Sequence, residues 1–88
     1  MLNISYSGQF KKDVERAKKQ GKDMKKLKHI IELLVEQKSL PIKLQDHPLK
    51  GNWKGYRDLH IEPDWLLIYK FGISNIRFER TGTHSEIF

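Results

Sequence analysis

The chain has 88 residues, of which 32% are charged and 38% are hydrophobic, and it contains no cysteine. This length supports one hydrophobic core, so we expect a single domain over residues 1–88, and the composition excludes a disulfide framework or a thiolate-ligated zinc site. The longest apolar runs are far shorter than a membrane span and no signal-peptide core is present, so we expect a cytoplasmic protein with no membrane partner.

Positive charge is concentrated in the first half of the chain. Residues 1–44 hold eleven basic and five acidic residues, whereas residues 45–88 hold six of each, so the net charge of +6 arises entirely from the first half. Such a field attracts phosphate backbones by a salt-dependent interaction that does not depend on base sequence. Lysine-rich solvent faces of ordinary helices have the same composition, so charge alone leaves nucleic-acid binding and simple solubility open.

The first half predicts a short strand followed by two helices. Residues 2–6 favour a strand, and Ser7 is a suitable N-cap for a helix that runs to Gly21. Asp23 can cap a second helix, which Pro41 ends. The apolar positions that recur at helical spacing are Phe10, Val14 and Ala17 in the first helix, and Met24, Leu27, Ile30, Ile31 and Leu34 in the second. Lysines fill the opposite faces, so these stripes are expected to form core.

The second half predicts strands separated by glycine-marked turns. Residues 56–61 alternate, which places Tyr56, Asp58 and His60 on one face and their neighbours on the other. Residues 65–71 are apolar on both faces, as in a covered central strand. The order of the elements therefore predicts an α+β domain, with two N-terminal helices packed on one face of a mainly antiparallel sheet and the other face open.

The third of these strands, residues 75–81, leaves the position of Arg80 open. Its alternation places Arg80 on the same face as Ile76 and Phe78. Arg80 therefore reaches a polar site only through strand twist, a bulge near Gly82 or its position at the end of the strand.

Three histidines, His47, His60 and His84, lie in the strand half together with Asp64 and Arg80. RNA cleavage by internal transesterification needs a base for the 2′-hydroxyl, an acid for the leaving 5′-oxygen and a cation for the phosphorane. Imidazole titrates near neutral pH, and guanidinium binds phosphate oxygens bidentately. The three histidines and Asp64, with Arg57 or Arg80 as the cation, are therefore the candidate catalytic set.

Aromatic and basic side chains supply candidate RNA contacts. Single-stranded bases stack on aromatic rings, for which Trp53, Trp65 and Phe88 are available, although Trp65 is equally suited to burial in the central strand. We also assign Arg57 and Lys54 to RNA binding.

The chain resembles the YafQ branch of the RelE superfamily of bacterial toxins. The resemblance covers nearly the whole chain and rests on a set of spaced matches, of which the most specific lie between Asp46 and His84. The matching segments are Tyr6-Ser7-Gly8-Gln9, Lys12-Asp13-Val14, Lys22-Asp23-Met24, Asp46-His47-Pro48-Leu49, Gly51, Trp53-Lys54-Gly55-Tyr56-Arg57-Asp58, His60, Glu62-Pro63-Asp64-Trp65, Ile68-Tyr69-Lys70 and Arg77-Phe78-Glu79-Arg80-Thr81-Gly82-Thr83-His84.

The resemblance implies a RelE-like fold and a toxin of a type II toxin–antitoxin system. By resemblance, the activity is that of an mRNA interferase, an endoribonuclease that cuts mRNA in the A site of the 70S ribosome and inhibits translation. It further implies metal-independent chemistry without a cofactor, and silencing by an antitoxin of the DinJ or RelB type. The lysine-rich first half is expected to contact ribosomal RNA or the antitoxin.

The resemblance also suggests a division of roles at the site. His84 is expected to act as general acid, His60 or Asp64 as the base or as the group that orients it, and Arg80 as phosphate stabiliser. His47 is expected to position the substrate. Trp65 and Phe88 are expected to lie beside the bases.

Three alternatives remain. The same histidines with Asp64 could serve as ligands in a metal-dependent hydrolase, but no His-x-x-x-His or clustered carboxylate pair supports such a site. A non-catalytic RNA-binding or antitoxin-binding module would keep the basic helices without the chemistry. A ribonuclease that does not depend on the ribosome would keep the chemistry alone.

Overall fold

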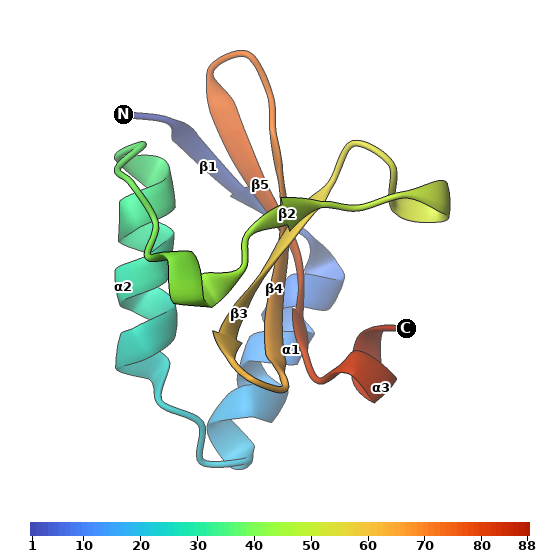
Figure 1. Ribbon diagram of the computed structural model, residues 1–88. Coiled ribbons are helices and arrows are strands. Elements are labelled where there is room, and N and C mark those ends of the chain that lie inside the picture. Colours follow the sequence, from blue (N-terminus) through green and yellow to red (C-terminus); the bar gives the residue numbers. More distant parts are fainter.

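The computed structural model describes residues 1–88 as a five-stranded sheet with three helices (Figure 1). The elements in chain order are β1 (Asn3–Tyr6), α1 (Gly8–Lys19), α2 (Met24–Val35), β2 (His47–Pro48), β3 (Arg57–Glu62), β4 (Trp65–Phe71), β5 (Asn75–Gly82) and α3 (His84–Ile87). Single 3₁₀ turns, η1 (Ile42–Leu44) and η2 (Gly51–Trp53), flank β2. No helix has the length and apolar character that crossing a membrane requires.

Helices α1 and α2 begin where their capping residues predict. Ser7 Oγ accepts a hydrogen bond from the backbone N–H of Phe10 at 2.8 Å, and the Asp23 carboxylate accepts one from Lys25 at 3.0 Å. Each bond satisfies a backbone donor that has no partner within the helix. Their apolar stripes face the sheet, as the periodicity predicted.

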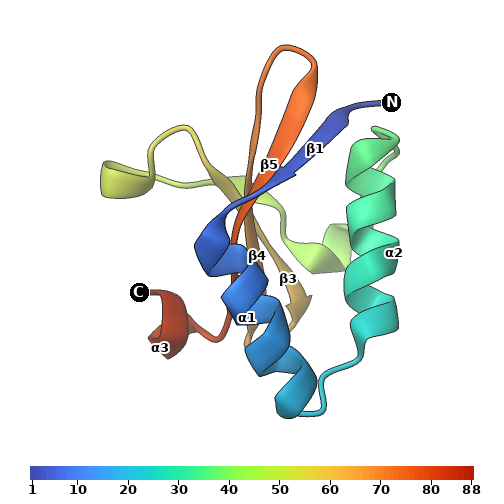
Figure 2. The same ribbon diagram turned by 180° about the vertical axis from the view of Figure 1, so that it is seen from behind.

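The sheet has the strand order β1-β5-β4-β3-β2, in which β1 pairs with β5 in parallel and every other pair is antiparallel. Helices α1 and α2 lie together on one face (Figures 1 and 2). The predicted α+β arrangement is confirmed. The prediction missed β2 and α3, because two-residue and four-residue elements are too short to show a period.

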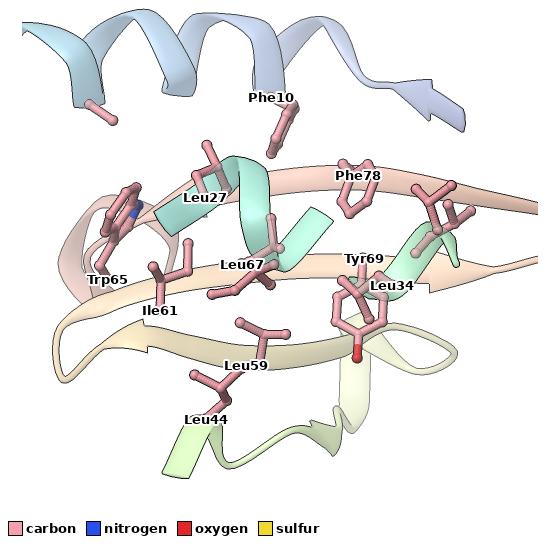
Figure 3. Packing of buried hydrophobic residues seen from close by; sticks show 14 residues of the cluster. Phe10, Leu27, Leu34, Leu44, Leu59, Ile61, Trp65, Leu67, Tyr69 and Phe78 are labelled. Atoms are coloured by element: carbon pink, nitrogen blue, oxygen red, sulfur yellow. The ribbon is translucent and has the colours of Figure 1, made fainter. Parts of the chain in front are cut away.

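The core lies between the two helices and the sheet (Figure 3). Phe10 of α1 packs near Phe78 of β5, with ring centroids 5.8 Å apart. Trp65 also belongs to this core: its side chain is 1% exposed and its Nε1 donates to Thr81 Oγ1 at 3.0 Å. The assignment of Trp65 to RNA stacking is therefore corrected, because a ring buried in the core has no open face for a base.

A bulge in β5 decides where Arg80 lies. Tyr69 of β4 pairs with Phe78, but the next residue of β4, Ile68, pairs with Arg80, so Glu79 is an extra residue in β5. An extra residue reverses the alternation beyond it. Arg80 therefore lies on the opposite face from Phe78, and the bulge, one of the three alternatives, is the one that the structure adopts.

The second face of the sheet is not fully open. Leu66 and Ile68 of β4 point away from the main core, yet neither has any exposed surface. Helix α3 packs against β5 at one end of this sheet (Figure 1). The expectation of an open face is therefore wrong at the centre of the sheet, where a second, smaller apolar layer lies under the polar residues described below.

Candidate active site

Strand pairing brings the predicted polar residues onto one face. His47 of β2 pairs with Asp58 of β3, Asp58 pairs with Ile68 of β4, and Ile68 pairs with Arg80 of β5. Directly paired residues share a face of the sheet, so these side chains form one row across four strands. His60 occupies the neighbouring row, and we call this surface, completed by His84 of α3, the imidazole face.

His84 and Asp64 form a hydrogen-bonded pair at one end of the imidazole face. One carboxylate oxygen of Asp64 accepts from both the backbone N–H of His84, at 3.0 Å, and the ring Nδ1, at 2.8 Å. These bonds lower the pKa of Asp64, so the carboxylate stays ionised and fixes the orientation of the ring.

His60 lies beside this pair. Its ring centroid is 5.7 Å from that of His84, and the two rings are tilted by 53°. The Nδ1 atom of His60 is 3.2 Å from the carbonyl oxygen of Pro63, in the turn between β3 and β4. The same short turn therefore supplies the partners of two imidazoles, Pro63 for His60 and Asp64 for His84.

His47 contacts a buried carboxylate that the sequence analysis did not assign to the site. Its Nδ1 is 2.7 Å from the carbonyl oxygen of Gln45, and its Nε2 is 3.1 Å from Asp58 Oδ1. Asp58 is 4% exposed, and Oδ1 has no hydrogen bond, so Nε2 approaches it without hydrogen-bond geometry. The alternation of β3 was the available signal, because it places Asp58 on the face of His60.

Burial raises the pKa of Asp58, while the nearby imidazoles His47, His60 and His84 oppose that effect. The carbonyl of Gln45 can only accept, so the Nδ1 of His47 carries a proton. Contact between Nε2 and Asp58 is then favourable only when a second proton lies on one of the two partners. The pair is therefore a place where this site can hold a proton.

A shared feature of the three imidazoles is that Nδ1 meets an oxygen that can only accept. The oxygens are the Gln45 carbonyl, the Pro63 carbonyl and the Asp64 carboxylate. Each Nδ1 therefore carries its proton, and Nε2 is the nitrogen left to exchange one. This arrangement can supply both a general base and a general acid over a short distance.

Hydrogen bonds to other protein groups hold the guanidinium of Arg80. Its Nε and Nη2 donate to the two carboxylate oxygens of Asp13 at 2.7 and 3.3 Å, and Nη2 also donates to the carbonyl of Glu86 at 3.2 Å. Its Nη1 makes no hydrogen bond within the protein. Only that end of the guanidinium is available to a phosphate.

Arg57 lies away from the imidazoles. It pairs with the buried residue Tyr69, which places it on the helix-side face, and its guanidinium contacts the Asp46 carboxylate at 3.1 Å. Tyr69 donates to the same carboxylate, and burial raises the tyrosine pKa. This placement favours Arg80 over Arg57 as the cation beside the imidazoles. Arg57 fixes the segment that leads into β2, and its assignment to RNA binding stays a prediction.

The C-terminal ring meets the loop before β3. Phe88 is 57% exposed, and its ring packs edge-on against Trp53 with centroids 5.8 Å apart. Trp53 in turn contacts Tyr56 edge-on at 5.5 Å. Lys54 is exposed next to Trp53. An aromatic group with a lysine at its edge therefore lies where α3 ends.

A cleft of about 450 Å³ lies beside His60, and its lining includes Lys26 and Lys43. Nowhere in the chain do three or more His, Asp or Glu side chains come close enough together to hold a metal ion. The imidazoles are instead spread along the face, each with its own oxygen partner.

The five-stranded sheet, with helices on one face and the imidazole face on the other, agrees with the RelE-like toxin fold that the resemblance implies. A family model described as the bacterial toxin of type II toxin–antitoxin systems, YafQ, matches residues 2–88. The chain belongs to this YafQ family.

Individual relatives agree with this assignment. The chain is 56% identical over 87 residues to the mRNA interferase toxin YafQ of Escherichia coli strain K12, covering 98% of this chain and 95% of the relative. It superimposes on the crystal structure of YafQ from E. coli strain BL21(DE3) with a TM-score of 0.95 at 54% identity, covering 100% and 99% of the two chains. A chain of the E. coli DinJ–YafQ complex gives a TM-score of 0.92 at 55% identity, with the same coverage.

Proposed function

We propose that this chain is an mRNA interferase that cuts mRNA in the A site of the 70S ribosome, in the cytoplasm, by metal-independent transesterification. The observation that carries the proposal is the set of three imidazoles on one face, each with Nδ1 bound to an acceptor and Nε2 left to exchange a proton. Membership of a toxin family and the 56% identity to a curated mRNA interferase support the substrate class.

In the proposed mechanism, the Nε2 of His60 takes the proton of the 2′-hydroxyl, and the 2′-oxygen attacks phosphorus. The P–O5′ bond breaks, and the Nε2 of His84 donates the proton that the leaving 5′-oxygen needs. The products are a 2′,3′-cyclic phosphate and a 5′-hydroxyl. Each proton transfer contributes about 10²–10⁴-fold. The ring separation of 5.7 Å suits two groups acting on opposite sides of one phosphate.

The remaining groups support this step. Asp64 orients His84 through Nδ1, and the free Nη1 of Arg80 faces the charge that develops on the phosphorane. His47, with Asp58, positions the RNA and holds a proton nearby. Phe88 offers a ring for base stacking, and Lys54 offers a charge for the backbone.

We further propose that an antitoxin of the DinJ type neutralises the chain. The similarity to the toxin of the DinJ–YafQ complex supports this partner. A groove of about 590 Å³ between α1 and α2 is lined by apolar residues, including Phe10, Val14 and Ile31, and bordered by three lysines and two glutamates. Such a groove suits an apolar protein segment with charged flanks, as an antitoxin could supply.

The experiment is primer extension on a defined mRNA, with and without 70S ribosomes, in excess chelator. We expect the wild-type chain to cut at particular codons only on ribosomes. The variant His84→Ala should lose at least about 100-fold in rate because the leaving oxygen loses its acid. The matched control is His29→Ala, since His29 is an exposed histidine of α2 outside the site.

The other outcomes separate the alternatives. Cutting of free RNA would support the nuclease activity but contradict its dependence on the ribosome. Cutting that stops in chelator would overturn the metal-independent step. Binding to ribosomes without any cleavage would instead identify a binding module.

A further inference from the structure

We propose that Asp13 of α1 is a positioning residue for the cleavage site: its carboxylate fixes Arg80 and, through Arg80 and Arg16, holds α3 with His84 and Phe88. The inference deepens the proposed function and rests on it. Asp13 lies on α1 beside the edge of β5, and its role follows from what it binds.

Asp13 is a fully buried charge with a complete set of donors. Its side chain has no exposed surface, and it accepts hydrogen bonds from Arg80 at 2.7 Å, the backbone N–H of Thr81 at 3.1 Å and Gln9 at 3.1 Å. Nη2 of Arg16 forms an ion pair with it at 3.1 Å. Burial raises the pKa of Asp13, but the hydrogen bonds, led by that of Arg80, outweigh it and lower the pKa. The carboxylate is therefore charged, and removing one of its partners would leave a buried charge uncompensated.

The location of Asp13 follows from the end of β1. Strand β1 pairs with β5 only as far as Tyr6 opposite Phe78, so the rest of that edge of β5 has no neighbouring strand. Helix α1 lies there instead. Asp13 accepts the N–H of Thr81, and Arg16 donates to the Thr81 carbonyl at 3.3 Å. Side chains of α1 thus satisfy the backbone groups that a strand would otherwise have paired.

Helix α3 depends on the same group of side chains. It has four residues, none of which is buried, and so short a helix is not stable by itself. Two of its polar contacts come from arginines: Arg80 Nη2 donates to the Glu86 carbonyl, and Arg16 Nε lies 3.0 Å from the Glu86 carboxylate. Gln20 donates to the same carboxylate, and His84 donates to Asp64. Both of these arginines are bound to Asp13. One buried carboxylate therefore holds two cations that help to attach α3.

The contact with Asp13 also fixes the orientation of the Arg80 guanidinium. Asp13 occupies the edge formed by Nε and Nη2, and this leaves Nη1 as the free end. An arginine without this partner would turn about its flexible side chain. The carboxylate therefore determines which nitrogen of Arg80 is left for a phosphate, and it helps to hold the helix that carries His84, whose ring Asp64 orients.

The first test compares Asp13→Asn with Glu15→Gln, a matched control whose carboxylate on the same helix is exposed and pairs only with Lys18. The assay is single-turnover cleavage on programmed ribosomes. We expect Asp13→Asn to lower the rate constant at saturating ribosome by about 100-fold, as a misplacement near 1 Å does, with the half-saturating concentration within about two-fold of wild type. Glu15→Gln should match wild type in both quantities.

A double-mutant comparison tests whether Asp13 acts through Arg80. In an Arg80→Ala background, Asp13→Asn should cost far less than the loss of about 100-fold that it causes alone, because only its link through Arg16 to α3 remains. The proposal would be overturned if the fold-losses in the rate constant caused by Asp13→Asn and Arg80→Ala multiplied in the double variant, since the two residues would then act independently. It would also be overturned if Asp13→Asn cut at the wild-type rate.

A further variant covers the case in which Asp13→Asn does not fold. Arg80→Lys keeps the positive charge but loses the two-pronged contact and the bond to Glu86. The heteronuclear ¹⁵N NOE of residues 84–88 should fall in this variant while that of residues 8–35 stays at wild-type values. An α3 as rigid as in the wild type would contradict the proposal. This readout needs no cleavage, so it remains decisive if the wild-type chain proves not to cut RNA.

Discussion

At the scale of single residues, this site is organised by what each imidazole binds through Nδ1. Two of the partners, the Gln45 and Pro63 carbonyls, are backbone atoms, and the third is the Asp64 carboxylate. Backbone partners do not depend on side-chain identity, so those two rings are oriented by the fold of the turns. The orientation of the His84 ring depends on a side chain, so of the three partners Asp64 is the one whose substitution can disturb an imidazole directly.

The buried carboxylate of Asp58 is predicted to lower the free energy of unfolding at neutral pH, although it serves the proposed reaction. Burial raises its pKa, so the folded state binds the proton more tightly than the unfolded state. Asp58 therefore contributes most to stability at pH values below its pKa in the unfolded chain, which is about 3.9. The free energy of unfolding decreases as the pH rises through the raised pKa of the folded chain. At pH 7, Asp58→Asn should therefore raise the melting temperature, by about 4–8 °C for a gain of 1 kcal/mol.

The same substitution should slow cleavage by about 10-fold or more, because His47 loses the carboxylate with which it holds a proton. Thermal unfolding from pH 5 to 8 and cleavage assays are the measurements. Glu62→Gln, which removes a partly exposed carboxylate of the same strand, is the control and should change neither quantity appreciably. A destabilised Asp58→Asn variant would contradict the account of its burial.

At the scale of elements, an ion pair between α1 and α3 passes close to the backbone at the end of β5 and holds α3 in place. A Cβ at Gly82 would lie 2.8 Å from Arg16 Nη2 and 2.9 Å from Glu86 Oε1. These side chains form the ion pair that attaches α3. The glycine therefore leaves room for a contact between a long helix and a short one.

Gly82→Ala is predicted to displace that ion pair. We expect a loss of at least about 1 kcal/mol in the free energy of unfolding, because the methyl group crowds the two side chains and because Gly82 has a φ of 156°, which residues with a side chain rarely adopt. Cleavage should also slow because His84 moves with α3. Urea unfolding and the cleavage assay measure the two effects. Gly8→Ala is the matched control: no atom lies within 4 Å of the position that its added methyl group would take, so it should be neutral or slightly stabilising.

At the scale of the whole molecule, charge and chemistry occupy different parts of the chain. The excess of basic residues lies in the half that forms α1 and α2, whereas the imidazoles lie on the opposite side of the sheet. The helices can thus contribute affinity for phosphate without supplying any group to the reaction. Affinity and rate should respond separately to substitution.

Ribosome binding is therefore predicted to weaken steeply with salt. If lysines of the helices neutralise four phosphates, the logarithm of the association constant should fall with the logarithm of salt concentration with a slope of about −3. The measurement is co-sedimentation of the inactive His84→Ala variant with 70S ribosomes. Replacing the unpaired Lys25 and Lys28 by Gln should flatten the slope, whereas Lys38→Gln, which removes a lysine already paired with Glu36, should change it less. A slope near zero would assign these lysines to solubility alone.

Much of this protein was determined by local sequence. The caps Ser7 and Asp23, the apolar stripes of the two helices and the alternation of β3 act within a few residues, and the structure confirms each of them. Family membership was equally readable, because it rests on spaced residues along nearly the whole chain. The candidate catalytic histidines could be named for the same reason, and their roles stay predictions.

Tertiary structure decided the rest, because it depends on pairing between residues far apart in the chain. The bulge at Glu79 reverses the face of Arg80, and neither periodicity nor composition marks it. Burial of Trp65 and Asp58, and the contact between Asp13 and Arg80 across 67 positions, likewise arise only when strands and helices pack. The sequence by itself determined which elements form and which side chains can do chemistry; packing determined which of those side chains face RNA and which hold the others in place.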